Sequence, residues 1–217
     1  MRTSILLLFL TLSLSIWSQT STNSDTLIVE YHPSGMIKSI STFSEGKKNG
    51  LEIHINQQGS LISEEYYLNN QLHGTVKRYR NFGKLMEEGK YVNGQVDGVY
   101  RKYYNNGKVQ EESEYKLGVK HGKSTWYYQN GNMVTQYTYQ DGDLEGEART
   151  YHKSGAIKTL FNYADNQRQG EYKEFYEDGS IKVEGSYNAG EKDGTWLFYD
   201  EEGKRDKKEK YVDGQLK

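Results

Sequence analysis

The sequence predicts an all-β protein in which eight 24-residue β-hairpins form one elongated, twisted antiparallel sheet. Three observations predict this fold class. Glycines recur every 24 residues in three registers, aromatic residues recur with the same period in two others, and no apolar pattern sustains the 3.6-residue period of a helix. A single hairpin of this size cannot bury its apolar face, whereas stacked neighbours can.

Residues 1–18 have the pattern of a secretory signal peptide. Met1 and Arg2 give a positive amino end, and an apolar run follows from Ile5 to Ile16. A helix of that length spans ~18 Å, short of the ~30 Å hydrocarbon layer of a membrane. We therefore expect cleavage near Ser18, a short linker over residues 19–25, and a periplasmic or extracellular protein. An uncleaved amino-terminal anchor is the alternative.

The repeats are expected to fill residues 26–217. One glycine register runs from Gly35 to Gly203, a second from Gly50 to Gly194, and a third from Gly46 to Gly214 with Asn70 and Asn166 in its two gaps. Every glycine except Gly89 and Gly185 lies in one of them. Asparagine is the residue that best replaces glycine at positive φ, so the third register predicts a left-handed turn position in every repeat.

The repeat Gly98–His121 illustrates the expected hairpin. Its segments Val99–Tyr104 and Val109–Tyr115 are rich in β-forming residues. Between them, only Gly107 belongs to a register, because the residue before that glycine varies from repeat to repeat. A single position of positive φ favours a three-residue loop, made of a type I turn and a glycine bulge, over a two-residue type I′ turn.

This loop pairs Tyr104 with Lys108 and places Tyr103 opposite Val109. Because Val109 and Tyr115 are six residues apart, we expect them on the same face of the strand. Tyr103, Val109 and Tyr115 would then share one side of the hairpin. The two aromatic registers, Phe43 to Tyr211 and Tyr31 to Tyr199, would form a single tyrosine column along the sheet.

The other face of the predicted sheet supplies the candidate binding surface. Its aromatic members are Tyr100, Tyr104, Trp126, Tyr128, Tyr172, Tyr176 and Trp196. In the second repeat the equivalent positions include Glu52, His54 and Asn56, so the architecture does not itself require aromatic residues there. Aromatic side chains exposed on a rigid sheet are typical of recognition surfaces. The alternative is that this face is a second, minor core.

The last repeat has the features of a cap. Arg205 replaces the aliphatic residue of other repeats, and Lys207, Lys208 and Lys210 follow on the same strand. Lysines on a final strand discourage edge-to-edge aggregation.

Composition and motifs argue against catalysis. With no cysteine, the chain has no disulfide, thiol nucleophile or iron–sulfur ligand. Its 28 basic and 30 acidic residues balance, which gives no support to nucleic-acid binding through bulk charge. The five histidines form no metal-binding motif, and acidic pairs such as Glu87 and Glu88 alternate faces along a strand. We expect no enzyme activity, no metal and no cofactor.

Segments such as YVNGQVDGVYRKYYNNGKV and YNAGEKDGTWLFYDEEGK resemble MORN repeats of the variant common in bacteria. The resemblance covers residues 26–217, although Tyr100 and Trp196 stand where the common repeat has a second glycine. It implies strings of β-hairpins that act as scaffolds, protein-interaction modules or lipid binders, and one similar bacterial subgroup carries the label of a toxin–antitoxin antitoxin.

An export signal argues against neutralising a cytoplasmic toxin. We therefore expect an exported, non-catalytic interaction or scaffold module with a protein partner. Binding of a carbohydrate, another cell-envelope ligand or a lipid surface is the alternative, and the oligomeric state stays open.

Overall fold

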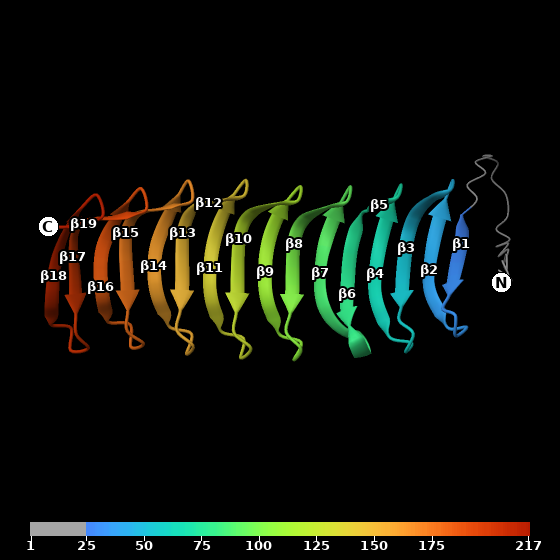
Figure 1. Cartoon of the computed structure of the whole chain (residues 1–217), viewed down its shortest axis with the longest axis horizontal. Coiled ribbons are helices and arrows are strands. Elements are labelled where there is room, and N and C mark those ends of the chain that lie inside the picture. Colours follow the sequence, from blue (N-terminus) through green and yellow to red (C-terminus); the bar gives the residue numbers. More distant parts are fainter. Residues whose placement is uncertain (1–24) are drawn as a thin grey trace, which may run out of the picture.

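The computed structural model describes residues 25–217, which form one long antiparallel sheet (Figure 1). The predicted signal peptide and most of the predicted linker lie outside these residues. Within residues 25–217, no helix is long and apolar enough to cross a membrane. The all-β prediction is confirmed.

In chain order the elements are β1 (Thr26–Tyr31), β2 (Ile37–Ser44), β3 (Lys47–Ile55), β4 (Leu61–Leu68), β5 (Gln71–Leu72), β6 (Gly74–Arg80), the single 3-10 turn η1 (Asn81–Gly83), β7 (Lys84–Val92), β8 (Gln95–Tyr103), β9 (Val109–Lys116), β10 (Val119–Tyr127), β11 (Met133–Gln140), β12 (Asp143–Leu144), β13 (Gly146–Tyr151), β14 (Ile157–Ala164), β15 (Gln167–Phe175), β16 (Ile181–Asn188), β17 (Glu191–Tyr199), β18 (Arg205–Val212) and β19 (Gln215–Leu216).

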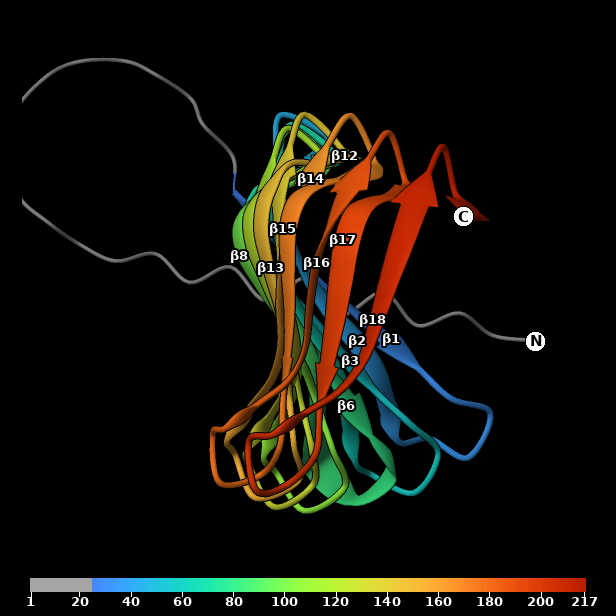
Figure 2. The ribbon, with the colours of Figure 1, turned by 90° about the vertical axis from the view of Figure 1, so that its left-hand side faces the viewer.

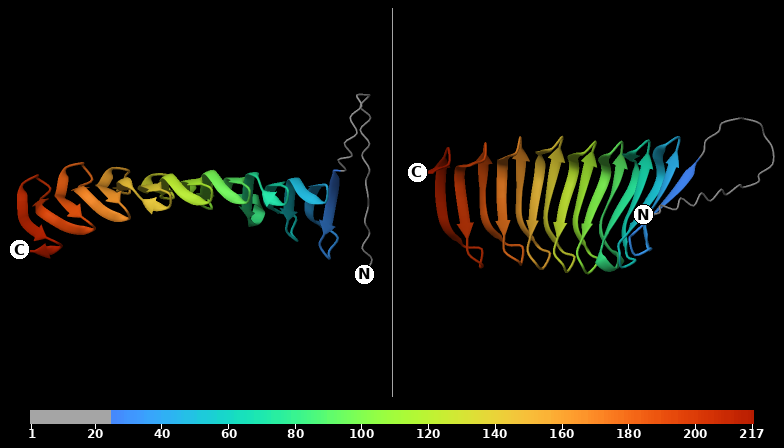
Figure 3. Two further views of the ribbon diagram at one scale, coloured as in Figure 1. Left: turned by 90° about the horizontal axis from the view of Figure 1, so that it is seen from above. Right: turned by 45° about the vertical axis from the view of Figure 1, so that its right-hand side comes forward.

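Each strand pairs with its neighbour along the chain, so the strands lie in sequence order from one end of the sheet to the other (Figures 1 and 3). At two positions in the sheet, the place of one strand is taken by two short strands. β5 and β6 lie end to end beside β4, as β12 and β13 do beside β11. The sheet twists along its length and its strands curve, which Figure 2 shows from one end.

Except at Asn81–Gly83, the turns at one end of the strands have the three-residue form that the sequence predicted. The amide of Tyr104 donates to the carbonyl of Lys108 at 2.8 Å, and that of Gly107 donates to the carbonyl of Tyr104 at 3.0 Å. Gly107 has a φ of 80°, and the other glycines of its register also have positive φ. The glycine is the one position that is the same in all of these loops.

The turns at the other end of the strands are two-residue turns, and both residues of each turn are left-handed. The third glycine register supplies the second position, as predicted, with Asn70 at φ 68° and Gly118 at φ 81°. The residue before it is left-handed as well, for example Leu117 at 48° and Ala189 at 47°. Two consecutive positive φ values are the signature of a type I′ turn. Asn or Asp, which type I′ turns favour, stands at the first position in five of the eight turns, whereas Glu45, Leu117 and Ala189 carry no such signal.

From the second onward, each of these turns also forms a hydrogen bond with the preceding hairpin. The amide of Gly118 donates to the carbonyl of Val96 at 2.8 Å, 22 residues earlier, and Gly142 donates to Lys120 in the same way. The amide of Leu117 finds its acceptor in the side chain of Asp97 at 3.1 Å. His121, Glu145 and Gln169, which occupy the same position in the next three repeats, accept equivalent bonds and link one turn to the next.

The prediction that Tyr103, Val109 and Tyr115 share a face is wrong. Lys102 pairs with Glu111 and Tyr103 with Val109, so Gln110 is an extra residue that forms a β-bulge. Such a bulge breaks the two-residue alternation of side chains. Tyr115 packs on Tyr100, with ring centroids 6.0 Å apart, whereas Tyr103 points away from Tyr100. The two tyrosine registers therefore lie on opposite faces of the sheet.

Most of the core lies within one face of this single sheet, although Tyr151 is buried on the other. We call the face with most of the core the aromatic face, because it carries the register that runs from Phe43 to Tyr211. Val76, Phe161 and Trp196 are almost fully buried there, and Ser113 and Ser124 are fully buried. Small residues stand beside large rings, since Ser113 pairs with Tyr100 and Ser124 pairs with Tyr137.

The two glycines outside the registers serve this packing. A Cβ on Gly89 would lie 2.8 Å from the ring of Tyr100, and one on Gly185 would collide with the ring of Trp196. Neither has a positive φ. Gly89 and Gly185 are therefore required because a Cβ would collide with a neighbouring ring. The register glycines instead have a left-handed backbone.

We predict that Gly107→Val destabilises the fold by about 1–2 kcal/mol or more, and that Lys108→Val has a much smaller effect. An added Cβ at Gly107 meets nothing within 4 Å, so the loss would come from the left-handed backbone alone. Urea unfolding followed by tyrosine fluorescence measures both variants. Equal midpoints for the two variants would contradict the turn assignment.

Candidate interaction surfaces

The structure divides the seven candidate binding residues between two places. Tyr100, Trp126, Tyr172 and Trp196 lie on the aromatic face, among the tyrosines from which the sequence separated them. Trp196 contacts Tyr172, Tyr187 and Tyr211 at centroid distances of 5.3, 5.1 and 6.3 Å. Edge-to-face and tilted contacts of this kind contribute about 0.5–1.5 kcal/mol each beyond the area that they bury.

Exposure differs among these four residues. Trp196 is only 2% exposed and donates its indole N–H to the carbonyl of Ser186, so it belongs to the core. Tyr100, Trp126 and Tyr172 are half-buried. No second layer of residues 25–217 covers this face, and rings that stabilise the sheet therefore also meet solvent.

Cationic side chains cap several of these rings. The ammonium of Lys192 lies 4.2 Å from the centroid of Trp196, and that of Lys120 lies 4.7 Å from the centroid of Trp126. The guanidinium of Arg168 lies 4.9 Å from Phe161. These positions are the ones that a ligand cation would take over an aromatic ring, and the chain's own residues fill them.

Tyr104, Tyr128 and Tyr176 lie at the three-residue loops instead. The hydroxyl of Tyr104 donates to the carbonyl of Tyr127 at 2.6 Å, and that of Tyr176 donates to Tyr199 at 2.8 Å. Each bond reaches the next hairpin, 23 residues on. Two of these tyrosines therefore connect neighbouring loops. That all seven candidate residues bind a partner stays a prediction.

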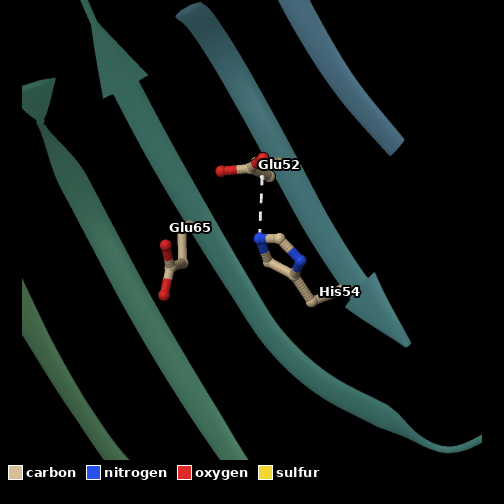
Figure 4. A group of neighbouring side chains, drawn as sticks. All are labelled: Glu52, His54 and Glu65. Atoms are coloured by element: carbon tan, nitrogen blue, oxygen red, sulfur yellow. Dashed lines mark ion pairs between the residues drawn. The ribbon is translucent and has the colours of Figure 1, made fainter. Parts of the chain in front are cut away.

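The aromatic face changes character in the first hairpins, where acidic and histidine side chains gather. Glu52 and His54 lie on β3, and Glu65 lies opposite Glu52 on β4 (Figure 4). One ligand atom from each lies within 4.8 Å of the others, and His54 Nε2 is 3.5 Å from Glu52 Oε1. One nitrogen and two carboxylate oxygens form a donor set suited to Zn²⁺.

The carboxylates of this cluster already have partners. Lys48 Nζ lies 2.7 Å from both oxygens of Glu52, and Ser41 donates to it at 2.8 Å. Burial raises the pKa of Glu52, but the hydrogen bonds from Lys48 and Ser41 outweigh it, so the pKa lies below its usual value. A metal would compete with Lys48 for both oxygens. The cluster therefore forms a polar network where later hairpins place aromatic rings.

The opposite face of the first two hairpins is mainly apolar, with Thr42 and Glu64 among its polar residues, which the sequence analysis did not anticipate. We call this surface the apolar patch; its residues are Leu27, Val29, Tyr31, Ile37, Ile40, Leu51, Ile53, Ile55, Leu61 and Tyr66. They meet across the strands, as in the pairs of Ile40 with Val29 and with Ile53. Leu27 is 61% exposed, Tyr31 58% and Tyr66 44%.

Two shallow hollows mark this surface. The first, of about 460 Å³, lies between β1, β2 and β3, and its lining includes Leu27, Thr42 and Leu51. The second, of about 450 Å³, lies where the patch ends, beside Tyr66 and Lys77. The available sequence signal consisted of consecutive apolar residues at 27–29 and of Ile53, where four of the six later repeats have lysine or arginine.

Later hairpins place paired charges on this same face. Arg101 contacts Glu112 at 2.5 Å and Glu88 at 3.7 Å. The hydroxyl of Tyr103 donates to Glu88 at 2.6 Å, and Tyr199 makes the equivalent bond to Glu184. The face is therefore apolar at one end of the molecule and carries ion pairs and tyrosine–carboxylate bonds beyond it.

These features define a single-layer β-hairpin repeat protein in which no second layer of residues 25–217 covers the sheet. The family model of the MORN repeat variant matches six repeats, at residues 72–93, 96–117, 120–141, 144–165, 168–189 and 192–213. The chain therefore belongs to the MORN repeat variant family, as the sequence predicted. Such repeats generally mediate protein or membrane-lipid interactions, and the family is generally non-enzymatic.

No curated protein matches the chain. Similar solved structures include the crystal structures of TcdB2-TccC3-Cdc42, at 11% identity and a TM-score of 0.23, and of TcdB2-TccC3-TEV, at 12% identity and a TM-score of 0.20. Each similarity covers 88% of this chain and spans 13% of the other chain.

The tyrosine–carboxylate bonds predict a loss of stability in alkali. Burial and the neighbouring Glu88 raise the pKa of Tyr103 to about 12, whereas an unfolded tyrosine titrates near 10. The folded state keeps a proton that the unfolded state releases, so the contribution of Tyr103 to stability should be constant below pH ~9 and be lost between pH ~10 and ~12.

Urea midpoints measured across this range test the prediction. Tyr103→Phe, which has no proton to lose there, should show a shallower decline than the unmodified protein. Parallel declines in the two proteins would contradict a raised pKa at Tyr103.

Proposed function

We propose that this chain is an exported, non-catalytic interaction module that docks a protein partner on its apolar patch. The observation that carries the proposal is the patch itself, an aliphatic sheet face that no other part of residues 25–217 covers. An apolar sheet face is normally buried against a second layer. Large exposed apolar patches on soluble proteins mark interaction sites.

The surroundings of the patch favour a protein over a lipid surface. Beyond Tyr66 the same face continues into paired charges such as Arg101 with Glu112, which suits the polar rim of a protein interface. The two hollows can receive side chains of a partner, as anchor residues require. The net charge of −2 offers no attraction to anionic lipid headgroups. Export is supported by the pattern of residues 1–18.

The alternative of a carbohydrate or cell-envelope ligand would use the aromatic face. Half-buried rings such as Tyr172 present flat apolar surface, which is the feature that favours it. Against it, Trp196 is buried and Lys192 and Lys120 already cap their rings. We therefore rank this alternative below the protein partner.

Leu27→Lys combined with Tyr66→Lys should reduce binding of the partner at least tenfold, because two buried charges would replace anchor contacts in the interface. Partners are first captured from envelope extract on the immobilised protein and identified, and each is then titrated in purified form. Both substituted side chains are exposed in the free protein, so its unfolding midpoint should change little.

Val99→Lys is the matched control. Val99 occupies the same hairpin position as Leu27, on the same face and also exposed, but two hairpins beyond the patch. It should leave binding intact. Equal binding by both variants would refute the patch as the docking site, and binding to protein-free vesicles or to glycans would favour the alternatives.

A further inference from the structure

Both ends of the sheet carry strands with an open edge. Among residues 25–217, β1 pairs only with β2. β18 pairs with β17 along its length, and with β19 only at Tyr211 and Val212. The outer side of Arg205–Lys210 therefore faces no strand of the described chain. An edge with unpaired amides and carbonyls is a template for another strand.

The repeat register shows which strand fits that edge. β19 lies beside β18 as β5 lies beside β4, since Tyr211 pairs with Leu216 as Tyr67 does with Leu72. β6 then follows β5 along β4, with Glu64 paired to Lys77 and Ser63 to Arg78. Counted in steps of 24 residues, Lys77 and Arg78 correspond to Val29 and Glu30 of β1, and Ser63 and Glu64 to Lys207 and Lys208 of β18.

We propose that copies of this chain join head to tail, with β1 of one copy paired to the outer edge of β18 of the next. β1 then takes the place beside β18 that β6 has beside β4. β19 of one copy and β1 of the other lie end to end along β18, as β5 and β6 do along β4. The junction continues the repeat without a change of register. This inference is independent of the apolar patch and of its proposed partner.

The hydrogen bonds between turns support the same junction. The second residue of these turns donates its amide to a carbonyl 22 residues earlier, from Asn70 to Lys48 through to Gly214 and Lys192. Gly46 occupies this position in the first repeat, and its amide has no such acceptor among residues 25–217. In the joined pair, the carbonyl of Leu216 of the neighbouring copy has the register of that acceptor.

Charge favours this pairing over pairing of like ends. Glu30 would stand opposite Lys207, the register at which Glu87 stands opposite Lys102 within the sheet. Two β18 edges would instead bring the lysines of Lys207–Lys210 together, and like charges directly opposite one another destabilise strand pairs. The lysine-rich edge of β18 disfavours pairing with a second β18 and is complementary in charge to β1.

Cysteine trapping tests the register directly, because the chain has no cysteine of its own. Val29→Cys and Lys208→Cys chains are purified, mixed and oxidised. We expect a covalent heterodimer on a non-reducing gel, since directly paired strand residues lie ~5 Å apart, within disulfide reach. Val29→Cys mixed with Lys210→Cys should cross-link several-fold less, because the diagonal distance is ~7–8 Å.

The outcomes of trapping separate the arrangements. A dominant heterodimer of the Val29→Cys and Lys208→Cys chains supports the head-to-tail junction. Cross-linking of Val29→Cys chains mainly to one another would show two-fold β1 pairing and overturn the proposal. The proposal would also be overturned if no cross-link forms at the highest concentration tested and the unmodified protein sediments as a monomer at that concentration.

Charge reversal provides a second readout in solution. Glu30→Lys and Lys207→Glu each place like charges at the junction, and each should weaken association in sedimentation velocity by about five- to tenfold. An equimolar mixture of the two variants should recover association, because every mixed junction again pairs opposite charges. Both side chains are more than half exposed, but Glu30 pairs with Lys38 and Lys207 with Glu209 in the same chain, so the unfolding midpoint of each variant is measured alongside. Unchanged association of the single variants would refute the junction.

Discussion

The left-handed backbone at the hairpin turns is the constraint on which this molecule depends. The turns at one end of the strands each use a left-handed glycine, such as Gly107, and those at the other end use a type I′ pair such as Leu117 and Gly118. These turns fix the register of each hairpin and so decide which side chains meet across the strands. Their amides then bind the preceding turn, so the same conformation that closes a hairpin also joins it to its neighbour.

A sheet with no second layer among its described residues must bury its side chains against one another. The aromatic face does so with rings that interlock over small residues such as Ser113, Gly89 and Gly185. The first two hairpins depart from this scheme on both faces. A polar network around Glu52 replaces the rings on one side, and aliphatic side chains replace the ion pairs on the other. This double departure distinguishes the amino-terminal end of the described sheet, where we propose that a partner docks.

The fold could be predicted from the sequence because glycine spacing reports backbone conformation directly. Gly107 and the glycines of its register gave the loop type, and the exchange of Gly118 for Asn70 identified a left-handed position. The faces could not be predicted so easily, because the bulge at Gln110 has no residue signature and reverses the alternation that places Tyr103 and Tyr115. Leu117 and Ala189 show no sign of positive φ in their identity. The apolar patch was visible only as a local change of residue type, which a search for regular patterns passes over.

The contacts between hairpins join nearest neighbours, and this makes the length of the molecule an adjustable quantity. Each 24-residue unit adds two inter-strand spacings, about 9.5 Å, to the sheet. Removing a unit from the middle would bring the two ends closer by that step and leave the remaining junctions with the same geometry. The protein is in this sense a molecular ruler, in which the distance between its two ends is set by a whole number of hairpins.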